Sequence, residues 1–476
     1  MNTIQTIAKN TGALTLMHVV TMILGLIFTV SLARCFGDVA FGKYSFALAF
    51  TALFAVLMDL GFNQLTIREV ARDKTLAKKY MGNILIIKLF LSLIFFTLVV
   101  AVVNLMHYPS DTKVLVYIFG ASTVLNSFGQ LFRAIFHAFE KMEYDSLLTI
   151  IQQVIVVAIG LTLLFLGYDL IQVVSVYLLG GIINVVFSLI VMVKKFEKPE
   201  FEVNFAFWKT LIRNAIPFGL AAIFVIIYVR IDAVMLSMMV GDAPVGWYNA
   251  AVTLILGLSF IPGVFLGVFF PVFSKFHTSS IDSLKNAYEK TFKYLFIILF
   301  PIGIGTTLLA DKFILLLYGD QYTHSIIALQ ILIWWNVFGA LNWLFGTILL
   351  SINNEKIVAV STGIGAILNV ILNLFLIPIM SYVGASITTV ITEILLFALL
   401  FYYVSMHLYR LPLLNVTAKT IAAGIIMGIS IYYIKSFNVL MVVTIAGVIY
   451  FLALAALGGI SKEDITLIKE GIKRHD

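Results

Sequence analysis

Six ionisable side chains lie inside long apolar stretches of the chain, where a charge is poorly solvated. They are Asp59, Lys88, Arg133, Arg230, Asp232 and Glu393. Three of them are basic and three are acidic. This balance favours an anionic ligand, because a site for a cationic drug would be dominated by acids.

Arg133 belongs to a longer polar stripe. The stripe runs through Thr123, Asn126, Gln130, Arg133 and His137, whose spacings of three and four residues place them on one face of a helix. Lipid tails offer such side chains no partner, so the stripe faces protein or water. Interhelical packing is the simpler explanation. The amide, guanidinium and imidazole groups together favour a water-filled cavity.

The other charges leave alternatives open. Lys88 and Arg133 could reach the nearer membrane interface with their long side chains, and Arg230 could do the same at the opposite interface. Arg230 and Asp232 are two residues apart, so they point to opposite sides of their helix and cannot both face a narrow cavity. Asp232 shares its face with Tyr228 and Asn214, whereas Arg230 shares its own with apolar residues. Polarity alone therefore favours Asp232 as the cavity residue.

The apolar stretches themselves exclude a water-soluble fold. Of the 476 residues, 61% are hydrophobic and only 12% are charged, and the mean hydropathy is +1.06, whereas soluble domains carry about 25% charged residues. About 20 apolar residues span a bilayer as a helix. The apolar runs are continuous rather than alternating, so they predict helices and not a barrel.

We predict an all-α polytopic membrane protein with about fourteen transmembrane helices. Their approximate ranges are 13–34, 45–65, 82–104, 114–135, 146–166, 171–192, 214–239, 247–272, 292–311, 326–350, 357–378, 385–405, 416–434 and 439–458. The first is too long for a signal-peptide core, so we expect an uncleaved helix and a mature chain that starts near Met1. A short amphipathic helix is expected in the tail after Ser461.

Basic residues near helix ends stay on the cytoplasmic side. Placing both termini there assigns 23 Lys and Arg residues to the cytoplasm and five to the outside, namely Arg34, Lys43, Lys113, Lys312 and Lys435. The net charge of +7 therefore reflects topology and anionic lipid headgroups, and no nucleic-acid partner is expected. The single cysteine, Cys35, cannot form an intrachain disulfide, and we read it as a small lipid-facing side chain.

A turn motif occurs twice. Residues 37–44 read GDVAFGKY and residues 241–248 read GDAPVGWY, so Gly, Asp, Gly and Tyr match at one offset. Both turns follow an odd-numbered predicted helix on the same side, which predicts a parallel repeat. We therefore expect two six-helix lobes related by a pseudo-two-fold axis, 1–195 and 196–408, followed by helices 13 and 14 and a cytoplasmic tail in 409–476. Chance similarity between glycine-rich turns is the alternative.

Several short segments resemble a known family. They are Ala33-Arg34-Cys35-Phe36-Gly37 through Tyr44, Asp59-Leu60-Gly61, Arg68-Glu69-Val70-Ala71-Arg72, Pro217-Phe218, Tyr228-Val229-Arg230-Ile231-Asp232 with Met235-Leu236, and Asn369-Val370-Ile371-Leu372-Asn373 through Pro378, Gly384 and Ala385. This pattern resembles the polysaccharide and O-antigen flippases of the multidrug/oligosaccharidyl-lipid/polysaccharide (MOP) exporter superfamily. The resemblance spans most of the chain.

The resemblance implies a flippase and not an enzyme. Such a protein moves a polyprenyl-diphosphate-linked oligosaccharide from the cytoplasmic to the outer leaflet of the cell membrane by alternating access between two lobes. Arg133, Lys88 and Arg230, with Gln130 and Asn126, are the expected contacts for the diphosphate and sugars. Asp59, Asp232 and Glu393 are the candidates for coupling to H⁺ or Na⁺.

The implied partners are the lipid-linked oligosaccharide, membrane lipids, a coupling H⁺ or Na⁺ and glycan-assembly enzymes, with no cofactor and no metal. Two other functions remain open. One is a cation-coupled multidrug exporter of the same superfamily. The other is a membrane glycosyltransferase or polysaccharide polymerase, although the longest outer loop, 312–325, offers only Asp320 and His324 as polar candidates.

Overall fold

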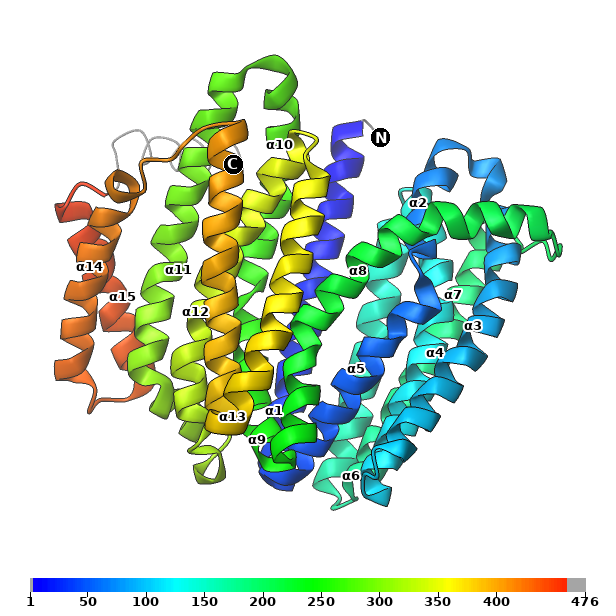
Figure 1. The fold of residues 1–476 in the computed structure, drawn as a ribbon, viewed down its shortest axis with the longest axis horizontal. Helices are drawn as coiled ribbons and strands as arrows, with labels where there is room; N and C mark the ends of the chain where they lie inside the picture. The colour runs from blue at the N-terminus through cyan, green and yellow to red at the C-terminus, as the bar shows by residue number, and fades with distance from the viewer. Residues whose placement is uncertain (1–2, 460–476) are drawn as a thin grey trace. The chain divides into compact units, whose positions relative to one another are not determined.

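The computed structural model describes residues 3–459, and this part of the chain is helical with no β-strand (Figure 1). The amphipathic helix expected after Ser461 lies outside the described residues. The helices group into two compact units. Unit 1 comprises residues up to Gly257 together with Ala366–Ala385, and unit 2 comprises Leu258–Gly365 and the residues from Ser386 onward.

Twelve helical stretches among the described residues are long and apolar enough to cross a membrane, which confirms the prediction of an all-α polytopic protein. Two single helices, Thr3–Asp59 and Glu355–His407, each contain a residue with non-helical φ and ψ angles, Gly37 in the first and Ser381 in the second. Each such break falls between two predicted spans. The count of fourteen, and the division into lobes at 195 and 408, stay predictions.

Unit 1 contains the first nine α-helices and part of a later one. They are α1 (Thr3–Asp59), α2 (Phe62–Arg72), α3 (Ala77–Leu105), α4 (Ser110–Ala138), α5 (Met142–Phe165), α6 (Leu170–Val174), α7 (Val176–Lys195), α8 (Phe205–Val240), α9 (Asp242–Leu258) and the middle of α13 (Glu355–His407), with a short 3₁₀ turn, η1 (Lys74–Leu76), before α3. Its core lies between α2, α3, α4 and the start of α8, where Phe62, Met81 and Phe136 are fully buried.

Unit 2 contains the remaining helices. They are α10 (Phe260–Ser279), α11 (Ile281–Leu317), η2 (Asp320–Tyr322), α12 (Ser325–Ser351), the two ends of α13, α14 (Leu413–Ile434) and α15 (Val439–Ala456). Phe292 of α11 and Phe345 of α12 stack in its core with 6.1 Å between ring centroids. The last two helices form a smaller cluster against α11, in which the Tyr450 hydroxyl donates to the carbonyl of Ile297 over 2.8 Å.

Two helices differ from their predicted bounds. The predicted 45–65 helix ends at Asp59, because Leu60 and Gly61 have positive φ values of 47° and 90°, and α2 then begins. The predicted 214–239 helix begins earlier, at Phe205, where the Asn204 side chain accepts from the backbone N–H of Phe207. Figure 1 shows this first part of α8 running across the direction of α3.

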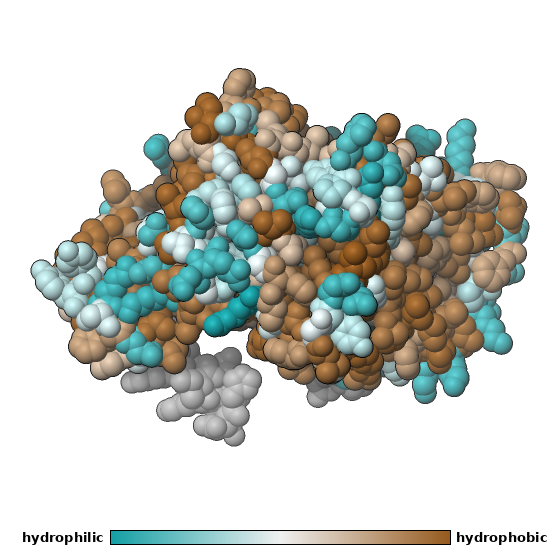
Figure 2. Space-filling model, turned by 90° about the horizontal axis from the view of Figure 1, so that it is seen from below, coloured by the Kyte–Doolittle hydropathy of each residue, from teal (hydrophilic) through white to brown (hydrophobic). Residues whose placement is uncertain are grey.

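Polar groups cap a turn between helices, and apolar side chains are exposed along the helix flanks, as expected of a protein that spans a bilayer. In the turn before α3, Thr75 donates to Asp73, and these hydrogen bonds lower the pKa of the Asp73 carboxyl. Large apolar side chains stay exposed on the helix flanks, with Ile379 at 79% and Leu93 at 69%. Figure 2 shows apolar residues over much of the visible surface and hydrophilic residues in separate groups. Large exposed apolar patches of this kind mark surfaces that contact a membrane or another protein.

Candidate functional site

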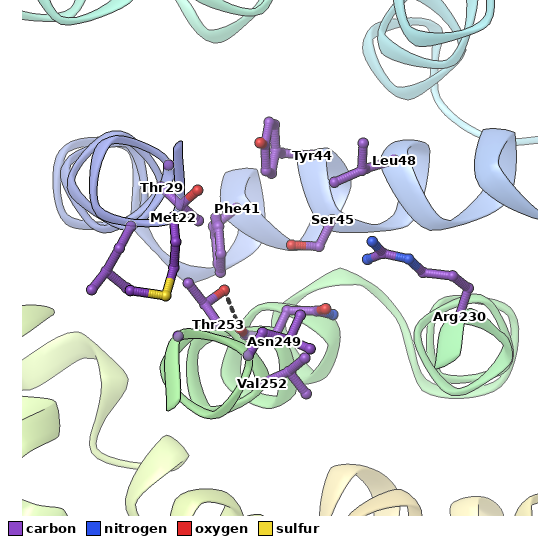
Figure 3. Close-up of a pocket in the computed structure, with 14 residues that line it drawn as sticks. Met22, Thr29, Phe41, Tyr44, Ser45, Leu48, Arg230, Asn249, Val252 and Thr253 are labelled. Carbon is purple, nitrogen blue, oxygen red and sulfur yellow. Dashed lines mark hydrogen bonds between the residues drawn. The ribbon is translucent and has the colours of Figure 1, made fainter. Parts of the chain in front are cut away.

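A cavity of about 230 Å³ opens within unit 1 between the two segments of α1 and helices α8 and α9. Figure 3 shows the side chains around it. The lining combines apolar residues with hydroxyl and amide groups and one cation: Met22, Gly25, Leu26, Thr29, Phe41, Tyr44, Ser45, Leu48, Arg230, Asn249, Val252, Thr253, Leu256 and Gly257. The cavity is therefore positively charged.

Arg230 is the cation of this cavity. Its half-buried side chain extends from α8 toward Ser45 of α1 (Figure 3). No Asp or Glu of the described residues forms an ion pair with it. A guanidinium with five N–H donors that is partly withdrawn from water needs an acceptor. The Ser45 hydroxyl and the side chains of Asn249 and Thr253 surround the same space, so a bound anion would meet both charge and hydrogen-bonding groups.

The ammonium group of Lys88, by contrast, already has a hydrogen-bond acceptor for each of its protons. Its side chain has no solvent exposure, and its Nζ lies 3.1 Å from Asp59 Oδ1. The same ammonium donates to the Ser127 hydroxyl over 2.8 Å and to the Ser127 carbonyl over 3.3 Å. These three acceptors use all three protons of the ammonium. Asp59, predicted as an ion-coupling residue, is thus the counter-ion of a predicted substrate-binding residue.

Arg133 is also paired. Its guanidinium lies 3.2 Å from Asp145 Oδ1 on α5 and donates to the Thr149 hydroxyl. The other oxygen of Asp145 lies 2.7 Å from Nε2 of His137. The two basic residues of the predicted stripe, Arg133 and His137, therefore share the Asp145 carboxylate between α4 and α5.

The amides of the same stripe have different surroundings. The Asn126 side-chain oxygen accepts from Gln152 on α5 over 3.1 Å and from Asn184 on α7 over 2.9 Å, which is the interhelical packing considered as the alternative. Gln130 is exposed. The structure thus places neither amide among the residues that line the Arg230 cavity.

Asp232 lies on the other side of α8 from the cavity lining. It is 2% exposed, and it accepts from the Tyr248 hydroxyl over 2.6 Å and from Asn373 Nδ2 over 2.5 Å. Asn373 also donates to Asn369. Two polar atoms of this cluster, Asn369 Nδ2 and Asn373 Oδ1, are buried without a hydrogen-bond partner. Arg230 lines the cavity and Asp232 does not, contrary to the expectation from polarity. The side chains of Tyr248 and Asn373 enclose Asp232 instead.

Glu393 lies in unit 2. It is 3% exposed and accepts a hydrogen bond from the side chain of Asn342, which also donates to the Glu393 carbonyl over 3.0 Å. The described residues contain no group of three His, Cys, Asp or Glu side chains that could hold a metal ion.

Sequence reasoning missed most of the cavity lining. Phe41 and Tyr44 lie within the first repeated turn and Asn249 follows the second. The sequence indicated these turns as a sign of an internal repeat and not as part of a site. Ser127, the second partner of Lys88, gave no signal because it lies outside the stripe on its helix.

The fold and the cavity define a multi-pass helical membrane protein with a cationic cavity beside a break in its first helix. The chain belongs to the family described as "Polysaccharide biosynthesis protein", whose sequence profile matches residues 7–277. This confirms the predicted membership of a polysaccharide-biosynthesis family.

Two sequence relatives cover parts of the chain. An uncharacterized membrane protein of Methanocaldococcus jannaschii is 27% identical over 58% of this chain and 56% of its own length. The lipid II flippase MurJ of Bacillus subtilis is 25% identical over 38% of this chain and 32% of its own length. The chain thus matches about half of the first relative and a third of the second.

Solved structures share the fold. The lipid II flippase MurJ in an inward closed conformation matches with a TM-score of 0.77 and 18% identity, over 95% of this chain and 99% of that one. An inward-facing multidrug-resistance transporter of the MATE family matches with a TM-score of 0.63 and 16% identity, over 81% of this chain and 95% of that one.

Proposed function

We propose that this protein is a flippase, not an enzyme, and that it carries a polyprenyl-diphosphate-linked oligosaccharide from the cytoplasmic to the outer leaflet by alternating access. The observation that carries the proposal is Arg230, a half-buried cation in a polar cavity with no carboxylate of the described residues paired to it. Membership of the polysaccharide biosynthesis family and similarity to a named lipid II flippase support a lipid-linked substrate.

A diphosphate headgroup needs such a cavity because hydrocarbon cannot solvate its charge. Arg230 supplies charge-assisted hydrogen bonds in place of water. The hydroxyl and amide groups of Ser45, Asn249 and Thr253 are suited to phosphate or sugar oxygens. At about 230 Å³ the cavity is smaller than the ~300–1,000 Å³ pockets that enclose whole ligands, so it holds one part of the headgroup at a time while the lipid tail stays in the bilayer.

The membrane potential can supply the driving force. Moving two negative charges out of a cell interior that is negative gains about 4.6 kcal/mol per 100 mV, twice the value for one charge. Coupling to an ion is then optional. If coupling exists, Asp232 is the first candidate, because buried amide atoms of Asn369 and Asn373 without hydrogen-bond partners lie beside it. Glu393 is the second candidate, and Asp59 becomes the least suited because Lys88 already neutralises it.

The proposal is tested by reconstituting the protein into vesicles with a fluorescent polyprenyl-diphosphate sugar. We expect Arg230→Ala to reduce transfer to the opposite leaflet at least tenfold, which corresponds to about 1.4 kcal/mol, and Arg230→Lys to retain part of the activity. Arg213→Ala is the matched control, because Arg213 is exposed on the same helix. Equal transfer by Arg230→Ala and Arg213→Ala would overturn the headgroup role.

Mass spectrometry of lipids that copurify with the protein identifies the substrate class. Lipid-linked glycans bound to the parent and absent from Arg230→Ala are expected. A cationic drug that competes for the same cavity, with no glycolipid bound, would instead favour a multidrug exporter.

A further inference from the structure

The first part of α8 lies outside the membrane span of that helix. The 36 residues of α8 make it about 54 Å long at ~1.5 Å per residue, whereas the hydrocarbon core of a bilayer is only about 30 Å thick. The candidate span is Ala222–Val240. Pro217 lies before it, inside the helix, where proline bends a helix. Figure 1 shows the part before this proline running across the direction of α3. Residues 205–216 are called the crossing segment below.

Contacts with α3 give the depth of the crossing segment. Just before the segment, the backbone N–H of Glu200 donates to the carbonyl of Lys78, in the first turn of α3, over 3.2 Å. Within the segment, the Trp208 indole donates to Asn83 Oδ1 over 2.8 Å, and its ring centroid lies 6.4 Å from that of Phe90. Phe90 is 60% exposed on the flank of α3. The crossing segment therefore lies beside the beginning of the predicted α3 span, at the depth of the membrane interface.

The crossing segment has two apolar sides. At about 100° per residue, Leu211 and Ala215 share one side, and both are buried in the core of unit 1. Phe205, Ile212 and Ile216 share the next side, and all three are exposed, Phe205 at 74%. Only one of the two apolar sides is therefore covered by protein.

Polar side chains follow on the remaining sides of the helix. Lys209 lies next to the exposed apolar side, and Arg213 lies further round, toward Thr210 and Asn214. These four side chains are exposed. No Asp or Glu occurs in residues 205–231, so the exposed apolar side is bordered by positive charge and by no negative charge of its own helix.

A helix with this order of sides is typical of the membrane interface, where the apolar side faces the acyl chains and basic side chains lie among the headgroups. We infer that the crossing segment binds anionic phospholipids, with Phe205, Ile212 and Ile216 against their acyl chains and Lys209 against their phosphates. Lipid is the occupant because the segment lies on the exposed apolar flank of α3. The leaflet is the inner one according to the distribution of Lys and Arg. The inference goes beyond the proposed transport function and does not depend on it.

The first test compares two fluorescent phospholipids that bind to the full protein in detergent. Phosphatidylglycerol carries a net negative charge, and phosphatidylcholine carries none. The parent protein should prefer phosphatidylglycerol, and added salt should reduce this preference because Lys209 is exposed. A cation near anionic lipid is worth about 1 kcal/mol, which is about fivefold in affinity. Lys209→Gln should therefore reduce the preference by up to about fivefold.

Lys141→Gln is the matched control for this test. Lys141 is also an exposed lysine of unit 1, but it lies in the turn between α4 and α5. Its replacement should leave the preference for phosphatidylglycerol unchanged. Equal affinities of the parent for the two phospholipids would overturn the inference, and so would an equal preference in the Lys209→Gln and Lys141→Gln variants.

The second test measures whether lipid covers the exposed apolar side. In a Cys35→Ser background, which removes the only cysteine, Ile212→Cys places a thiol on the apolar side and Thr210→Cys places one on the polar side. A fluorophore is attached to each thiol, and the protein is reconstituted into phospholipid vesicles. Brominated acyl chains should quench the fluorophore at position 212 several-fold more strongly than the one at position 210. Aqueous iodide should quench them in the opposite order.

Quenching of the fluorophore at position 212 by iodide and not by brominated acyl chains would overturn the inference. Such a result would mean that the apolar side is open to water and accessible to a protein partner. Failure of this inference is also distinguishable from failure of the proposed function. Both tests measure phospholipid contact without cargo, and Arg230→Ala should keep the parent's preference for phosphatidylglycerol, because Arg230 lies in the span of α8.

Discussion

At the scale of single residues, three cations that look alike in sequence have different electrostatic surroundings. Lys88 and Arg133 each lie beside a carboxylate, whereas Arg230 has no such partner in the described part of the chain. An intramembrane cation that is already neutralised contributes to folding, and one that is not is available to a ligand. Of these three cations, Arg230 is therefore the one that our proposal assigns to an anionic headgroup.

Removing either partner of the Lys88–Asp59 ion pair should destabilise the protein, but by different amounts. Lys88 is completely buried, whereas the Asp59 side chain is 32% exposed. Asp59→Asn strands an ammonium without its counter-ion and should cost about 3 kcal/mol, the low end for removing one partner of a buried pair. Lys88→Met leaves a carboxylate that solvent reaches and should cost less.

Thermal unfolding in detergent measures both variants. The double variant Asp59→Asn with Lys88→Met should be more stable than Asp59→Asn alone. A double variant that loses the sum of the two single losses would show that the pair does not interact.

The partners of these cations could not be predicted from the sequence. Lys88 and Asp59 are 29 positions apart, and Lys88 and Ser127 are 39 apart. Apolar periodicity gives the face of a helix but not which other helix meets it. The sequence did predict that Arg230 and Asp232 face opposite sides of their helix. Polarity alone favoured Asp232 for the cavity, whereas Arg230 lines it. The reason is that a buried acid that accepts hydrogen bonds from a hydroxyl and an amide also lies on a polar helix face.

At the scale of elements, bilayer thickness made the helices predictable. An apolar run of about 20 residues has only one common structure in lipid. Helix ends were less predictable where the helix begins before its apolar run, as at Phe205, or where two positive φ values interrupt it, as at Leu60 and Gly61. These features depend on local backbone conformation and not on hydropathy.

The break in α1 is predicted to require glycine. Gly37→Ala places a Cβ at φ 82° and ψ 175°, which should destabilise the protein by about 1–3 kcal/mol. Gly12→Ala, in the helical part of α1 with open space around it, should instead be neutral or stabilising by up to about 1 kcal/mol. Equal thermal midpoints for the two variants would contradict a special backbone conformation at Gly37.

At the scale of the whole molecule, two predictions concern the orientation of the chain in the membrane and the response of transport to the membrane potential. The distribution of Lys and Arg places the termini in the cytoplasm, which remains a prediction. A reporter thiol tests it, because Asp320 is exposed in the predicted outer loop 312–325 and Asp320→Cys in a Cys35→Ser background places a single thiol there. A membrane-impermeant maleimide should label intact cells through this thiol, and Cys35→Ser alone should give no signal. Labelling only after permeabilisation would reverse the topology.

Transport should respond to the membrane potential. If the headgroup crosses with two negative charges, imposing 100 mV, negative on the side from which the substrate starts, should favour transfer by about 4.6 kcal/mol. Potassium diffusion potentials of either sign in vesicles measure this effect. The same steady-state distribution of fluorescent lipid under both signs would mean that the charge is compensated by a co-transported or exchanged ion.

The two repeated turns contact each other reciprocally, because a Cβ atom on Gly42 would overlap the backbone carbonyl of Asp242 and one on Gly246 would overlap that of Asp38. This arrangement has the form of an isologous interface, in which residue i meets residue j and j meets i. Between two separate half-length chains, such a small patch would dissociate on dilution. Because one polypeptide carries both copies, the association is intramolecular, and linkage sets the effective concentration of one turn near the other. The contact therefore forms at any protein concentration.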